Sequence, residues 1–143
     1  METLDWASIA DVLAKIAVAY LLALPVAWDR EQHERSAGLR TFPLVATAAT
    51  GFILIARAEY GESPEAHARV LEGLITGIGF IGGGAILREH GSVRGTSTAA
   101  SIWATAAIGA ATAYGRYEIA VVLSVIIFAT LRVLSRFKAE DDA

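Results

Sequence analysis

Cysteine is absent from this sequence of 143 residues, so disulfides and thiolate metal sites are excluded. The stretch before the first apolar run, METLDWAS, contains no Lys or Arg, whereas a cleaved signal peptide begins with a positive segment. Basic residues form no stripe along the chain, so we expect no nucleic acid as a partner. The first apolar run is therefore predicted to be a retained membrane span.

Apolar residues, by contrast, are abundant in this sequence. They make up 55% of the chain, charged residues make up 19%, and the net charge is −3. The mean hydropathy of +0.49 is high for a soluble domain that needs a polar surface. The length suits one domain. We expect residues 1–143 to form a single domain embedded in the lipid bilayer.

Five apolar segments are visible, and together they predict an all-α, polytopic membrane helix bundle. They cover residues 7–28, 41–56, 71–87, 97–114 and 119–134. A spanning helix needs about 20 residues, with a tolerated range of about 17–25, so the second segment is marginal. An alternative with four spans, in which this segment lies in the membrane interface, breaks the alternation of charge between the loops.

The positions of Lys and Arg predict the orientation. One set of loops holds eight basic residues: Arg30, Arg35, Arg40, Arg88, Arg94, Arg132, Arg136 and Lys138. The other set holds three: Arg57, Arg69 and Arg116. Because basic residues concentrate on the cytoplasmic side, we expect the N-terminus outside and the C-terminus inside the cell.

Glycine is concentrated in the third apolar segment, where six of the thirteen glycines lie between Gly73 and Gly84. Gly77, Gly79 and Gly82 spell G-x-G-x-x-G, but no alternating strands and helices surround them, so a dinucleotide site is not favoured. G-x-x-x-G pairs give a flat face for close helix packing. Alternatively, a helix broken near Gly82 and Gly84 would expose backbone carbonyls and form an ion or substrate path.

Three segments resemble a known family. They are WDREQHERSAGLRTFPLVA at residues 28–46, GIGFIGGGAIL at residues 77–87, and GSVRGTSTAASIWATAAIG at residues 91–109. In this order they are similar to three motifs of the MgtC/SapB family of bacterial inner-membrane proteins, and the likeness covers about residues 10–134.

The resemblance implies a multi-pass protein of the bacterial plasma (inner) membrane, from a family linked to growth in low magnesium, virulence and survival inside host cells. Members are generally not regarded as magnesium pumps, and one branch modulates the F-type ATP synthase. The virulence branch carries an additional soluble C-terminal domain. This sequence ends nine residues after residue 134, so we expect the transmembrane domain alone and a poor transfer of the ATP-synthase role.

The first motif carries over a polar cluster, although Asp29 stands where the family usually has Glu and Phe42 where many members have His. The cluster comprises Asp29, Arg30, Glu31, Arg40 and Thr41, with Glu34 and Arg35 nearby. It is either a solvated loop that anchors the topology or a functional site. In the second case, Asp29 and Glu31 could hold Mg²⁺, which is the one cofactor considered. Arg40, at the start of a helix capped by Thr41, could hold a phosphate or a lipid headgroup.

Secondary candidates lie within the spans. Glu72 is expected either to pair with Arg69 at the interface or to face the interior of the bundle. Hydroxyl side chains recur at helical spacing in the fourth segment, at Thr98, Ser101 and Thr105. They either hydrogen-bond to a helix backbone or line a small polar cavity opposite the glycines. The three histidines lie in expected loops without the spacing of a metal site or a catalytic triad, so no enzyme is expected.

Two functions are considered first, and a structural helix bundle that organises other proteins is a third. The first is a non-enzymatic regulatory membrane protein linked to magnesium-limited growth or envelope homeostasis, acting through a membrane protein partner. The second is a small ion or solute transporter or channel with its site at the glycine-rich third helix. It would work as a homo-oligomer, because five short helices enclose little volume alone.

Overall fold

The computed structural model describes residues 5–33, 37–89 and 92–141, and within them the fold is an all-α bundle, as predicted. The five helices are α1 (Trp6–His33), α2 (Thr41–Tyr60), α3 (Pro64–Gly84), α4 (Thr96–Ala113) and α5 (Tyr117–Asp141). Between α3 and α4, the short strands β1 (Leu87–Glu89) and β2 (Ser92–Arg94) form an antiparallel hairpin that the sequence analysis did not predict.

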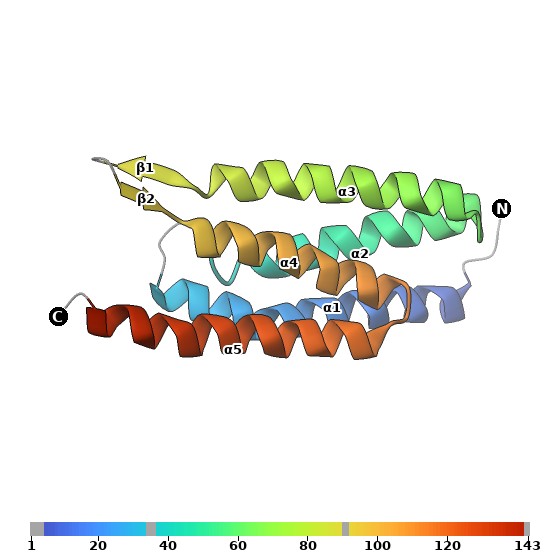
Figure 1. Cartoon of the computed structure of the whole chain (residues 1–143). Coiled ribbons are helices and arrows are strands. Elements are labelled where there is room, and N and C mark those ends of the chain that lie inside the picture. The colour runs from blue at the N-terminus through green and yellow to red at the C-terminus, as the bar shows by residue number, and fades with distance from the viewer. Residues whose placement is uncertain (1–4, 34–36, 90–91, 142–143) are drawn as a thin grey trace.

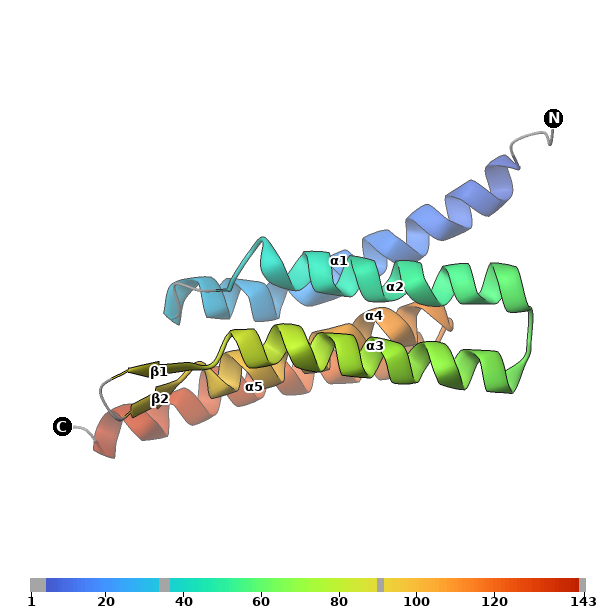
Figure 2. The ribbon, with the colours of Figure 1, turned by 90° about the horizontal axis from the view of Figure 1, so that it is seen from above.

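The five helices lie roughly side by side, and α4 is at their centre (Figure 1). It packs against each of the other four helices, whereas α3 packs mainly against α2 and α4. The hairpin continues beyond α3 and α4 at the end of the bundle where α1 and α5 finish (Figure 1). In Figure 2 the N-terminal part of α1 diverges from the bundle. Within α1, Pro25 removes one intrahelical hydrogen bond.

Small side chains allow α4 to occupy the centre. Its buried residues are mostly Ala, Ser, Thr and Gly, and only two of them, Ile102 and Ile108, are large. A Cβ atom on Gly109 would collide with the carbonyl oxygen of Ala46 in α2, so the two backbones are in direct contact there. Such close approach is the usual way in which helices associate inside a membrane, where lipid is as apolar as the side chains.

Three helices are long and apolar enough to cross a membrane: α1, α2 and the Tyr117–Leu134 part of α5. The length of α2 removes the reason for the four-span alternative, since this helix runs for 20 residues rather than the expected 16. By contrast, α3 starts with the polar sequence PEAHAR and α4 is rich in hydroxyl groups, so neither meets the same criterion. The crossing of α3 and α4 and the orientation of the termini stay predictions.

The helices extend over different residues from the expected apolar segments, and two of the differences matter for the site. First, α1 continues for five residues past Trp28, so Asp29, Arg30 and Glu31 are helical and not in a loop. Second, the third segment ends at Gly84 rather than at residue 87. The N–H groups of Ala85 and Ile86 bond to the carbonyl oxygens of Gly82 and Gly83 at 3.0 and 3.1 Å, which turns the chain into β1.

The start of α4 also depends on glycine. Gly95, with φ of 83°, is in the left-handed region, and its Cβ would collide with the carbonyl oxygen of Ala85. Other residues are strained in this conformation. Gly95, rather than one of the hydroxyl residues after it, therefore precedes the helix, with no side-chain cap.

Candidate functional site

Asp29 and Arg30 form a buried ion pair near the end of α1. Asp29 is fully buried and Arg30 is only 5% exposed. Arg30 donates to Oδ2 of Asp29 from Nη2 at 2.6 Å and from Nε at 3.2 Å. A buried ion pair gains little stability overall, but removing one partner leaves an uncompensated charge. The pair is therefore a feature that the surrounding helices must preserve.

The second carboxylate oxygen of Asp29 lies near a histidine and an arginine without a hydrogen bond. Oδ1 has no hydrogen-bond partner among the described residues. His33 Nδ1 lies 3.8 Å from it, and Arg132 Nη1 of α5 lies 3.9 Å from it. The same His33 nitrogen is 2.7 Å from the carbonyl oxygen of Asp29. One carboxylate thus joins the end of α1 to α5, and its surroundings are positive.

Glu31 has a different role from Asp29. Its Oε2 accepts a hydrogen bond of 2.8 Å from the backbone N–H of Leu39, just before α2 begins. This is possible because residue 38 is glycine: a Cβ atom on Gly38 would collide with the Glu31 carboxylate. Glu31 therefore stabilises the connection between α1 and α2, and a cation shared by Glu31 and Asp29 stays a prediction. Among the described residues, no three His, Cys, Asp or Glu side chains are close enough to hold a metal ion.

Arg40 and Thr41 form no hydrogen bond or ion pair with Asp29 or Arg30 among the described residues. Arg40 is exposed, and it is Arg40 rather than Thr41 that precedes the first turn of α2, without a side-chain cap. The N–H groups of Thr41 and Phe42 both bond to the carbonyl oxygen of Gly38, at 3.0 and 3.2 Å. Pro43 has no N–H group. The start of α2 therefore offers an anion few free backbone donors, and only side chains remain. Glu34 and Arg35 lie outside the described residues.

Four glycines of α3 were candidates for close helix packing or an ion path: Gly77, Gly79, Gly82 and Gly84. A Cβ on Gly82 would lie 3.1 Å from the carbonyl oxygen of Ala99 in α4, so this glycine packs closely. Around Gly77, Gly79 and Gly84 a Cβ would meet nothing within 4 Å, so their role in packing stays a prediction. The helix is also continuous up to Gly84, so it is not broken at mid-length.

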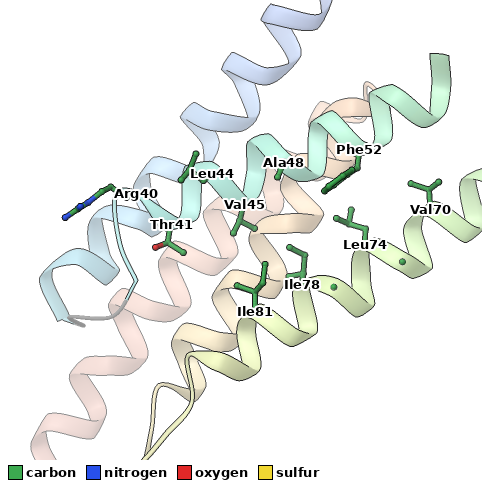
Figure 3. Close-up of a pocket in the computed structure, with 12 residues that line it drawn as sticks. Arg40, Thr41, Leu44, Val45, Ala48, Phe52, Val70, Leu74, Ile78 and Ile81 are labelled. Atoms are coloured by element: carbon green, nitrogen blue, oxygen red, sulfur yellow. The ribbon is translucent and has the colours of Figure 1, made fainter. Parts of the chain in front are cut away.

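An apolar groove runs between α2 and α3. Its volume is about 710 Å³, and its lining includes one charged residue, Arg40, at one end. Figure 3 shows the side chains of Phe52, Leu74 and Ile78 in the space between the two helices. The full lining is Arg40, Thr41, Leu44, Val45, Ala48, Phe52, Val70, Gly73, Leu74, Gly77, Ile78 and Ile81.

The hydroxyl stripe of α4 is buried and bonds mainly to its own helix. Ser101 donates to the carbonyl oxygen of Ser97 at 2.7 Å, and Thr105 donates to that of Ser101 at 2.8 Å. Thr98 is fully buried, and its Oγ1 has no hydrogen-bond partner among the described residues. The hydroxyl groups of Ser101 and Thr105 thus find hydrogen-bond acceptors within α4, whereas that of Thr98 does not.

Glu72 faces outward and not into the bundle. It is exposed on α3, and no ion pair with Arg69 is present among the described residues. The interpretation in which Glu72 lies inside the bundle was wrong. The neighbouring Leu71 and Leu74 take the inward positions, against the cluster formed by Ile53, Ala110 and Ala113.

A second polar cluster, which the sequence analysis missed, lies at the opposite end of the bundle. His67 is in the first turns of α3, not in a loop, and its Nδ1 is 2.9 Å from the hydroxyl oxygen of Tyr114. Its Nε2 is 2.7 Å from the carbonyl oxygen of Gly61. Arg57 donates to the carbonyl oxygen of Ala113 at 3.0 Å. These residues are far apart in the sequence, so spacing carried no signal for them.

Two features define the class of protein: a bundle with apolar helices of membrane-spanning length, and charged side chains placed near the helix ends. This is a helical integral membrane protein. The sequence pattern of the MgtC family matches residues 16–140 of this chain. The chain belongs to the MgtC family.

Similarity to named relatives agrees with this assignment. The chain is 38% identical to Protein MgtC of Salmonella typhimurium strain LT2 over 115 residues, which is 80% of this chain and 48% of that protein. It is 37% identical to Protein MgtC of Brucella abortus strain 2308 over 129 residues, which is 90% of this chain and 53% of that protein. The chain spans about half the length of the curated relatives it matches. No solved structure matches it.

Proposed function

We propose that this chain is a non-enzymatic regulatory protein of the bacterial inner membrane, with several spans, that supports growth when magnesium is scarce. The observation that carries the proposal is the buried Asp29 carboxylate, which has one oxygen bonded to Arg30 and the other facing His33 and Arg132. Charged groups within membrane helices are costly and are retained where they have a function. Membership of the MgtC family supports the link to magnesium.

The cluster suits a regulatory contact better than a cation site. Two arginines approach one carboxylate, and their positive charges would repel an incoming Mg²⁺ ion. The cluster instead fixes the end of α1 against α5, close to the polar surface at that end of the bundle. A membrane protein partner that contacts this end would detect the relative position of the two helices. Mg²⁺ acts in this proposal through growth conditions and not as a resident cofactor.

Growth at limiting magnesium tests the proposal. A strain lacking this chain is complemented with the wild-type protein, with Asp29→Asn or with Asp11→Asn. Asp11 is the matched control, because it lies on the same helix and pairs with Lys15 in an exposed position. We expect the Asp29 variant to fail at low magnesium and the Asp11 variant to support growth, with equal amounts of protein in the membrane fraction. Equal growth of both variants would show that the function does not depend on the charge of Asp29.

A further inference from the structure

The groove between α2 and α3 is open along one side of the bundle. Leu44 is 64% exposed and Phe52 is 57% exposed, although both are large apolar residues. Gly73 and Gly77 form part of the opposite wall, and a Cβ atom on either would meet nothing within 4 Å. Missing side chains on α3 thus create a hollow in an otherwise apolar surface. A groove of about 710 Å³ falls within the usual range for small-molecule sites.

One end of this hollow is polar. Arg40 is the only charged residue in its lining, and Thr41 beside it adds a hydroxyl group. Arg40 is exposed and has no hydrogen-bond or ion-pair partner among the described residues, and no carboxylate lines the groove. Figure 3 shows Arg40 at one end, with its side chain extending outward from α2 and away from α3, and mainly apolar side chains along the rest of the groove. An occupant that complements this pattern is apolar along its length and anionic at one end.

The length of the groove matches one leaflet of a bilayer. The lining residues of α2 extend from Arg40 to Phe52, which is about 18 Å of helix at 1.5 Å per residue. Half of a hydrocarbon core of about 30 Å is about 15 Å. An occupant whose charged group lies at Arg40 would therefore reach the middle of the bilayer at Phe52.

The polarity of the lining favours a lipid over a protein helix. A phospholipid carries one anionic group at one end of an apolar chain, and the groove has one cationic residue at one end of an apolar lining. A flexible acyl chain is also thinner than a helix of about 10 Å in diameter, so it follows an irregular apolar surface more closely.

We propose that the groove between α2 and α3 binds one anionic phospholipid, with an acyl chain along Leu44, Phe52 and Gly77 and the phosphate at Arg40 and Thr41. The start of α2 has few free N–H groups, so the phosphate is held by side chains and not by the helix terminus. Arginine suits this role because its guanidinium group matches phosphate oxygens. This inference does not rest on the proposed role of Asp29, which lies outside the groove lining.

Matched pairs of variants test the proposal. Gly77→Leu fills the groove, whereas Gly79→Leu adds the same side chain to α3 outside the groove lining, and both positions have open space. Arg40→Ala removes the charge, whereas Arg88→Ala removes another exposed arginine, from β1 outside the lining. All four proteins and the wild type are reconstituted in vesicles of equimolar phosphatidylglycerol and phosphatidylethanolamine. Each is then extracted in mild detergent, and the retained lipid is identified by native mass spectrometry.

We expect the wild type, Gly79→Leu and Arg88→Ala to retain one phosphatidylglycerol per chain. Arg40→Ala should retain several-fold less phosphatidylglycerol relative to phosphatidylethanolamine, and Gly77→Leu should retain several-fold less of both. Helical content by circular dichroism confirms that each variant is folded. Unchanged retention in Arg40→Ala or in Gly77→Leu would overturn the proposal. Loss of a dimer in Gly77→Leu, with lipid unchanged, would identify a second copy as the occupant and overturn it as well.

Discussion

Gly109 of α4 lies directly against the backbone of Ala46 in α2, leaving no room for a methyl group between them. The contact also brings Thr50 within reach: its hydroxyl group donates to the carbonyl oxygen of Gly109 at 3.0 Å as well as to that of Ala46 at 2.9 Å. We predict that Gly109→Ala lowers the free energy of unfolding by about 1–3 kcal/mol, the usual effect of overpacking. Denaturation by sodium dodecyl sulfate in mixed micelles measures the change.

Gly51 of α2 is the control for this prediction. A Cβ atom there would meet nothing within 4 Å, and the residue is helical. Gly51→Ala should therefore leave stability unchanged or raise it by up to about 1 kcal/mol, through the better helix propensity of alanine. Equal destabilisation by the two substitutions would show that α2 and α4 are not in contact at Gly109.

The contrast between Gly109 and the glycines of α3 shows where sequence reasoning succeeded and where it failed. Glycine at helical spacing predicted close packing, and the dense cluster at residues 73–84 drew attention. Yet among the described glycines within helices, the isolated Gly109 leaves the least room for a Cβ atom next to a neighbouring helix, whereas a Cβ on Gly77 or Gly79 would meet nothing within 4 Å. Spacing shows which residues share a face of a helix, but it does not show which face a neighbouring helix covers.

Glu31 should stabilise the connection between α1 and α2 through its carboxylate. We predict that Glu31→Ala lowers the free energy of unfolding by about 1 kcal/mol, because the N–H of Leu39 loses its acceptor. Glu31→Gln keeps an acceptor oxygen and should cost less. Thermal unfolding in detergent separates the two variants. If both behave like the wild type, the hydrogen bond contributes nothing to stability.

Substitution of Gly38 should lower the free energy of unfolding through the same hydrogen bond between Glu31 and Leu39. A Cβ atom there would displace the Glu31 carboxylate, so Gly38→Ala is expected to lose the same hydrogen bond. In the double variant Glu31→Ala with Gly38→Ala, the two effects should overlap rather than add. Fully additive losses, measured by the same thermal unfolding, would contradict a shared origin.

The pair of Asp29 and Arg30 should respond as a unit. Asp29→Leu leaves Arg30 buried without its main partner, and Arg30→Leu does the converse. We predict that each single substitution lowers the free energy of unfolding by about 3 kcal/mol or more, and that the double substitution costs clearly less than their sum. A double-mutant cycle measured by the detergent titration gives the coupling. Additive losses would mean that the two side chains do not interact energetically.

The first family motif directed attention to Asp29 and Arg30, but their environment was not visible in the sequence. The expected loop is helix, and the partner of the second carboxylate oxygen, Arg132, is supplied by α5 about a hundred residues later. Similarly, the five residues of the expected polar cluster have three different roles. Asp29 and Arg30 form a buried pair, Glu31 stabilises the connection between α1 and α2, and Arg40 and Thr41 line one end of a groove. Because these residues are close in the sequence, one site was predicted. Helix packing places them in three different environments.

The absence of cysteine makes the membrane topology directly testable. Single cysteines are introduced at Glu62, between α2 and α3, and at Ser92 in β2, both of which are exposed. With five spans and the N-terminus outside, a thiol reagent that does not cross the membrane should label Glu62→Cys in intact cells. It should label Ser92→Cys only after the cells are permeabilised, because the hairpin with Arg88 and Arg94 is expected on the cytoplasmic side. Labelling of both in intact cells would mean that α3 does not cross the membrane. Labelling of Ser92→Cys alone would reverse the orientation, and with it the leaflet that the Arg40 end of the groove faces.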